Sequence, residues 1–96
     1  MIASFGDRRT ADLFHGTTTS SVRKLSHDVQ RRALNKLDML NAAHRIDDLR
    51  SPPGNRLEAL KGNMAGFHSI RVSQQWRIVF RWEGNNAHEV SLLDYH

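Results

Sequence analysis

The chain has 96 residues, the length of one ordinary domain, so we expect a single domain over residues 1–96. Lysine and arginine number 14 against 10 acidic residues, and this net charge of +4 favours a polyanionic partner such as nucleic acid. The absence of cysteine excludes disulfides and thiolate zinc sites, and no signal peptide or membrane-spanning apolar run is present, so we expect a cytoplasmic protein with no membrane partner.

The N-terminal part of the chain predicts short elements joined by polar residues. Residues 2–5 have the composition of a short strand, and Asp7 is suited to cap a helix over residues 10–15. Residues 17–21 are all Thr or Ser, and we interpret them as a polar connector.

The longest predicted helix covers residues 27–43, with Ser26 as its N-cap. Apolar residues recur at intervals of four, four and three, the pattern of an amphipathic helix: Val29, Ala33, Leu37 and Leu40. Polar residues lie off this stripe: Arg31, Arg32, Asn35 and Lys36. We interpret their face as a solvated surface in preference to an RNA-binding one. A further helical turn is expected over residues 45–49.

Strands are predicted in the second half, because the run Ser51-Pro52-Pro53-Gly54-Asn55 stops helix formation. The residue pattern beyond it predicts four strands, over residues 56–60, 68–72, 76–82 and 89–95. We therefore expect an α+β fold, in which two N-terminal helices pack on one face of a twisted, mainly antiparallel sheet.

Strand alternation sorts the side chains of this sheet into two faces. Trp76, Ile78 and Phe80 share the face that we expect the helices to cover. The opposite face collects basic residues, together with one carboxylate: Arg56, Glu58, Arg71, Arg77 and Arg81. Such a face could bind a phosphate backbone or could simply be charged surface in water, and the residues alone support both interpretations equally.

These residue types suffice for RNA cleavage without a metal ion. A base must remove the proton of the ribose 2′-hydroxyl, an acid must protonate the departing 5′-oxygen, and cations must stabilise the charge on the phosphate oxygens. Glu58 could act as the base and His96 as the acid, with Lys61 and Arg77 as the cations. A C-terminal histidine is more often part of a frayed tail, and spacing alone does not bring the four residues together.

No motif for metal, nucleotide or serine-hydrolase chemistry is present. The six histidines form no i, i+4 pair and no H-E-x-x-H motif, and the chain has no Walker-type phosphate loop and no G-x-S-x-G elbow. We therefore expect no metal and no cofactor.

Several segments, taken in order, resemble the HigB toxins of the RelE superfamily. They are residues 56–63 (RLEALKGN), 66–72 (GFHSIRV), 75–80 (QWRIVF) and the terminal Asp94-Tyr95-His96. The start of the chain, Met1-Ile2 and Ser4-Phe5, is also similar, and residues 51–58 resemble the GraT branch of the family. The resemblance extends over nearly the whole chain and is weakest at residues 6–25.

The resemblance implies a toxin of a type II toxin–antitoxin module, with a fold like that of microbial ribonucleases. Most members of the family cleave mRNA in the ribosomal A site without a metal ion and leave a 2′,3′-cyclic phosphate. The resemblance also implies neutralisation by a HigA-like helix-turn-helix antitoxin, and contact with operator DNA only through the antitoxin complex.

The resemblance further implies roles for individual residues. Lys61 and Arg77 match basic catalytic positions, and the terminal trio matches the functional C-terminus of HigB toxins: Asp94, Tyr95 and His96. Some HigB toxins carry a histidine at position 58, whereas YoeB toxins carry a glutamate that acts as the base. The identity of the base therefore stays open between Glu58 and a C-terminal residue. We expect three arginines to bind RNA: Arg56, Arg71 and Arg81.

Other functions remain open at this point. ParE toxins share the superfamily fold but inhibit DNA gyrase through a protein interface, and a GraT-like toxin could disturb ribosome assembly. A plain nucleic-acid-binding module is a third possibility, although it has no use for the pair formed by Glu58 and His96.

Overall fold

Helices precede a small sheet along the chain. The computed structural model describes residues 1–95, in which the α-helices are α1 (Arg8–His15), α2 (Ser20–Arg23) and α3 (His27–Ala42). The short 3₁₀ turns are η1 (Ile46–Arg50), η2 (Pro53–Asn55) and η3 (Gly62–Met64). The strands are β1 (Glu58–Ala59), β2 (Phe67–Arg71), β3 (Trp76–Glu83) and β4 (Asn86–Asp94).

Polar side chains fix the ends of the first two helices. The Asp7 carboxylate accepts a hydrogen bond from the backbone nitrogen of Thr10 (2.7 Å), which confirms Asp7 as the N-cap of α1. The prediction of a connector over residues 17–21 is wrong in part, because α2 begins within it. Thr19 caps this short helix, and burial of Val22, which is 3% exposed, holds it against the core.

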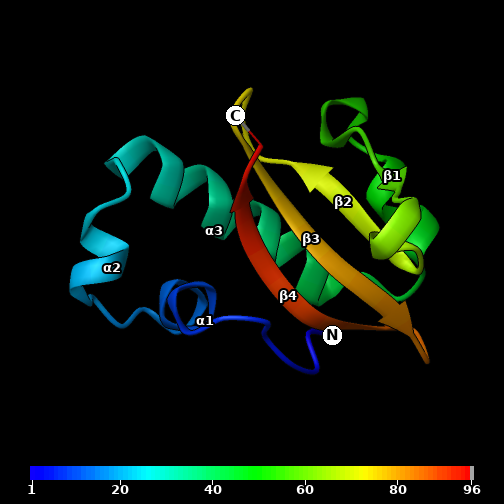
Figure 1. The fold of residues 1–96 in the computed structure, drawn as a ribbon, viewed down its shortest axis with the longest axis horizontal. Coiled ribbons are helices and arrows are strands. Elements are labelled where there is room, and N and C mark those ends of the chain that lie inside the picture. Colours follow the sequence, from blue (N-terminus) through cyan, green and yellow to red (C-terminus); the bar gives the residue numbers. More distant parts are fainter. Residues whose placement is uncertain (96) are drawn as a thin grey trace.

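The helix α3 supplies the helical half of the core. It ends within one residue of the predicted boundary, and Ser26 accepts a hydrogen bond from the backbone nitrogen of Val29 (3.1 Å). Its stripe of Ala33, Leu37 and Leu40 is fully buried. Figure 1 shows α3 crossing one face of the sheet, with α1 beside β4 and α2 farther from the sheet, next to α1. The two predicted helices are thus α1 and α3, and α2 is an additional one.

The sheet has the order β1-β2-β3-β4, and every neighbouring pair is antiparallel, which confirms the predicted α+β class. The predicted strand over residues 2–5 is reduced to two parallel bridges, from Ile2 to Ala87 and from Phe5 to Val90. The predicted strand over residues 56–60 is reduced to two residues. Its first residue, Arg56, adopts a left-handed conformation (φ 45°) that interrupts an extended chain.

The two faces of the sheet differ as alternation predicts. Ile78 and Phe80 of β3 are fully buried against the helices, together with Ile70 of β2. The outer face of β3 carries Arg77 and Val79, and both are buried as well. This part of the outer face is therefore covered rather than open to water, and it holds the candidate site.

Candidate active site

Arg77 is a buried cation on the outer face of the sheet. The residue is only 9% exposed. Its Nε donates a hydrogen bond to the hydroxyl of Ser69 (2.9 Å), and its Nη2 donates one to the backbone carbonyl of Arg56 (2.7 Å). These bonds from separate segments fix the plane of the guanidinium. None of the hydrogen bonds described for residues 1–95 uses Nη1, so Arg77 keeps donors for an oxyanion.

Glu58 and Tyr95 both lie next to this guanidinium. Oε1 of Glu58 is 3.8 Å from Nη2 of Arg77, and the Glu58 side chain is 59% exposed. The register explains the proximity, because β1 pairs Glu58 with Ser69 on the same face of the sheet. The ring of Tyr95 lies 5.8 Å from Cζ of Arg77, within cation–π range, and Tyr95 is about half exposed. An accessible carboxylate, a fixed cation and an accessible aromatic ring therefore meet here.

Other predicted basic residues surround this group. Arg71 is the cross-strand partner of Arg77, and its Nε donates a hydrogen bond to the carbonyl of Ser73 (3.3 Å). Arg56 supports Arg77 through its backbone, while its side chain lines a neighbouring cavity. Lys61 is exposed at the start of η3 and forms no ion pair with any residue among 1–95.

Two of the predicted site residues, Arg81 and Asp94, make their described contacts with residues other than Arg77 and Glu58. Arg81 lies four residues beyond Arg77, about 13 Å along the strand. It forms ion pairs with Glu89 and Glu83, and the hydrogen bond that it donates to Glu89 raises the pKa of its guanidinium above the ordinary value. Asp94 pairs with Trp76 across the strands and accepts a hydrogen bond from Nε2 of Gln75 (3.0 Å). His96, the predicted acid, lies outside the described residues.

Sequence reasoning missed two polar residues that position the others. Ser69 is fully buried and accepts the hydrogen bond from Arg77. The available signal was its place in β2, where alternation puts it on the same face as Arg71. Asn55 is also fully buried, although it stands in a segment whose composition predicts only a loop. Nothing local distinguishes it from a solvent-facing turn residue.

The described part of the chain has neither a metal-binding cluster nor a membrane-spanning helix. Within residues 1–95, no three His, Cys, Asp or Glu side chains gather in a way that could hold a metal ion. No helix in this part of the chain is long and apolar enough to cross a bilayer.

Solved toxin structures share this arrangement of helices and sheet. The YoeB-YefM complex from Staphylococcus aureus contains a chain that aligns with a TM-score of 0.63 at 14% identity, covering 100% of this chain and 98% of that one. A YoeB/ParE toxin from Agrobacterium tumefaciens aligns with a TM-score of 0.57 at 18% identity over the full length of both. The fold is therefore that of the YoeB and ParE toxins, the RelE fold.

Sequence comparison narrows this class. A family model described as a RelE-like toxin of the type II toxin–antitoxin system HigB matches residues 4–96. Toxin HigB-1 of Vibrio cholerae is 45% identical over 60 residues, which are 62% of this chain and only 63% of the Vibrio protein. A protein of Proteus vulgaris named Endoribonuclease HigB is 33% identical over the whole of both chains. This chain belongs to the HigB-like toxin family of type II toxin–antitoxin systems.

Proposed function

We propose that this chain is an endoribonuclease that cleaves mRNA in the ribosomal A site without a metal ion. The observation that carries the proposal is the fixed guanidinium of Arg77 with the accessible carboxylate of Glu58 beside it. The name of the Proteus relative supports RNA as the substrate. We also propose that residues 1–96 form one toxin domain and that the protein acts in the cytoplasm.

The proposed reaction is an attack of the ribose on its own 3′-phosphate. Glu58 takes the proton of the 2′-hydroxyl, and the 2′-oxygen then forms a bond to the adjacent phosphorus. Arg77 donates hydrogen bonds to the phosphate oxygens as their negative charge grows, and Lys61 adds a second cation. The bond from phosphorus to the 5′-oxygen breaks, and the leaving oxygen takes a proton from His96. The products are a 2′,3′-cyclic phosphate and a free 5′-hydroxyl.

The remaining residues of the site bind the strand in this proposal. The half-exposed ring of Tyr95 offers a surface on which a base can stack. Asp94, immediately before it, would set the direction in which the chain end leaves β4. Arg56, Arg71 and Arg81 would contact phosphates, although Arg81 must first give up contacts to two glutamates.

The proposed partners follow from the family. Type II toxins are held inactive by a protein antitoxin, and the aligned chains of Staphylococcus aureus come from toxin–antitoxin complexes. We propose a HigA-like helix-turn-helix antitoxin, through which the complex would bind operator DNA.

A cell-free assay tests the reaction. Purified ribosomes carrying a defined mRNA would be incubated with the toxin, and the mRNA ends would be mapped against the same mRNA without ribosomes. We expect cleavage only on the ribosome, lost in the His96→Ala and Tyr95→Ala variants and kept in Arg50→Gln. Arg50 is exposed, and its described side-chain contact is to Asp47 rather than to a residue of the site, so its replacement controls for loss of positive charge.

The outcome that contradicts the proposal is growth arrest by the wild-type toxin with intact mRNA. DNA breaks in the arrested cells would then assign the toxin to gyrase inhibition. Accumulated ribosomal subunit precursors would assign it instead to interference with ribosome assembly.

A further inference from the structure

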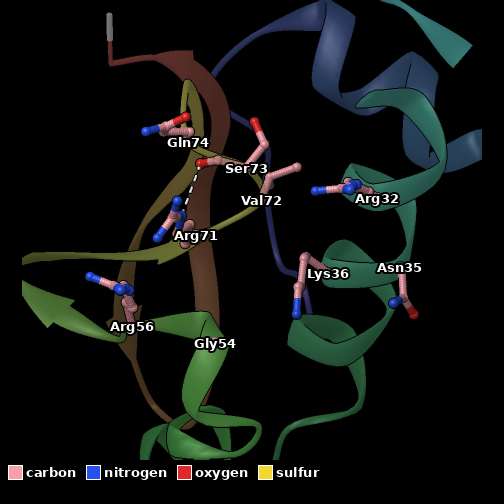
Figure 2. A pocket seen from close by; sticks show the side chains of 9 residues that line it. All are labelled: Arg32, Asn35, Lys36, Gly54, Arg56, Arg71, Val72, Ser73 and Gln74. Carbon is pink, nitrogen blue, oxygen red and sulfur yellow. Dashed lines mark hydrogen bonds between the residues drawn. The ribbon is translucent and has the colours of Figure 1, made fainter. Parts of the chain in front are cut away.

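A basic cavity lies between α3 and the turn that joins β2 to β3. Its volume is about 470 Å³, and its charged lining comes from both sides. Figure 2 shows Arg32 and Lys36 of α3 on one side, with Arg56 and Arg71 on the other. No carboxylate is among the described residues that line it. The cavity therefore concentrates positive charge from three separate segments of the chain.

Lys36 is held in the cavity by a buried neighbour. Its Nζ donates a hydrogen bond to Oδ1 of Asn55 (2.6 Å), and Asn55 in turn donates from Nδ2 to the carbonyl of Leu49 (3.1 Å). Because Asn55 is fully buried, this chain of bonds fixes the ammonium relative to the fold. Partial burial of Lys36 lowers its pKa below the ordinary value, and Lys36 forms no ion pair with any residue among 1–95.

Two of the other three cations of the cavity also lack an ion-pair partner among the described residues. Arg32 is paired with Asp28 (3.1 Å), but Arg56 and Arg71 form no ion pair with any residue among 1–95. Arg71 moreover stands directly opposite Arg77 across the strands, and like charges in that position repel. An anion bound between them would relieve this repulsion. The sequence alone favoured a solvated surface for Arg32 and Lys36, whereas their place in the cavity favours a ligand.

The cavity adjoins the candidate active site through two shared residues. Arg56 takes part in both, because its side chain lines the cavity and its carbonyl accepts the hydrogen bond from Arg77. Arg71 likewise lines the cavity and is the register neighbour of Arg77. A strand with one phosphate at Arg77 therefore has a second cationic position within reach, which favours a nucleic-acid strand over an isolated acidic side chain.

We propose that this cavity is a phosphate-binding subsite, in which Lys36, Arg56 and Arg71 hold a neighbouring phosphodiester of the RNA strand whose scissile phosphate lies at Arg77. The identity of the strand as RNA rests on the proposed function, but binding in the cavity does not require cleavage. The arginine forks suit the paired oxygens of a phosphodiester, and Lys36 adds a point charge.

The test measures binding of a short single-stranded RNA with 2′-O-methyl riboses, which cannot be cleaved by this route. Affinity would be measured by fluorescence anisotropy over a series of salt concentrations for wild type, Arg71→Gln, Arg56→Gln and the control Arg50→Gln. For single strands, each phosphate contact contributes about 0.7 to the slope of log affinity against log salt. We expect the slope to fall by about 0.7 in each cavity variant and to stay unchanged in Arg50→Gln.

Equal slopes in the cavity variants and the control would overturn the subsite, and so would a complete lack of RNA binding by the wild type. A glutamate-rich peptide serves as a competitor. If it binds more tightly than the RNA, and only while Arg56 and Arg71 are present, the cavity belongs to a protein partner instead.

The two proposals fail separately. Reduced slopes in the cavity variants together with an absence of mRNA cleavage by the wild type would leave the subsite standing without the nuclease. Normal ribosomal cleavage with unchanged slopes would leave the nuclease standing without the subsite.

Discussion

Replacing Ser69 by Ala should show how much the orientation of the Arg77 guanidinium matters, because the arginine itself is kept. The variant deletes the acceptor of the 2.9 Å hydrogen bond from Nε while leaving the guanidinium in the chain. A hydrogen bond to a charged group contributes about 1.5–3 kcal/mol, and the donor left behind is buried. A domain of this size has a free energy of unfolding of about 5–15 kcal/mol, so the variant should stay folded.

We expect Ser69→Ala to lower both the free energy of unfolding and the rate of cleavage. Since about 1.4 kcal/mol corresponds to a factor of ten in rate, the loss of orientation should lower kcat of ribosomal cleavage by about 10- to 100-fold. KM should change little, because Ser69 is fully buried and cannot contact a substrate directly. Urea unfolding and single-turnover cleavage on ribosomes would be measured on the same preparations.

The matched control is Ser91→Ala. Ser91 lies on the same face of the sheet, opposite Val79, and none of the hydrogen bonds described for residues 1–95 involves its side chain. This variant should keep both its stability and its rate. A Ser69→Ala protein that loses stability but cleaves at the wild-type rate would show that the bond to Arg77 is structural only, and the assigned positioning role would be wrong.

Further predictions concern other groups of the site and core. Glu58→Gln should lower the cleavage rate by about 10²- to 10⁴-fold with the fold intact, whereas a wild-type rate would assign the base to a C-terminal residue. Burial lowers the pKa of His68 below 6.5, so the unfolded chain binds its proton at higher pH and stability falls as pH drops below that value. His68→Phe should weaken this loss, measured as the change in the urea midpoint between neutral and mildly acid pH, and an equal loss in both proteins would contradict the assignment. Asn55→Ala should cost about 1–3 kcal/mol, because the Leu49 carbonyl and Lys36 lose a buried partner, and calorimetry would then show a Tm lower by about 4–8 °C per kcal/mol.

The sequence predicts those parts of the fold whose cause is local. The helix α3 follows from a periodic stripe and a capping serine, and both signals lie within the helix itself. The alternation of side chains along β3 correctly places Ile78 and Arg77 on opposite faces of the sheet, because this signal also lies within the element itself. The helix α2 escaped prediction because four residues carry too short a pattern, and its stability comes from tertiary burial of Val22.

The candidate site is predictable in its residue types but not in its geometry. Alternation places Glu58 and Arg77 on one face, and the structure confirms that they are neighbours. The burial of Arg77 depends on Ser69 and on a carbonyl 21 residues away along the chain, neither of which a local pattern reveals. The ion pairs of Arg81 with Glu83 and Glu89 could not be predicted either, because side-chain alternation does not show which charged groups lie beside it.

The turn at Arg56 connects the basic cavity with the candidate active site around Arg77. Its left-handed backbone is unfavourable for a residue with a side chain, so tertiary contacts must hold it. Two hydrogen bonds supply such contacts. Lys36 of α3 donates one to the side chain of Asn55, and Arg77 of β3 donates the other to the Arg56 carbonyl. A displacement of this turn would therefore shift the side chains of both Lys36 and Arg77. Because both cations are bonded to adjacent residues of one turn, their spacing is set before any ligand binds, which is the arrangement expected if the proposed strand places two successive phosphates there without further ordering.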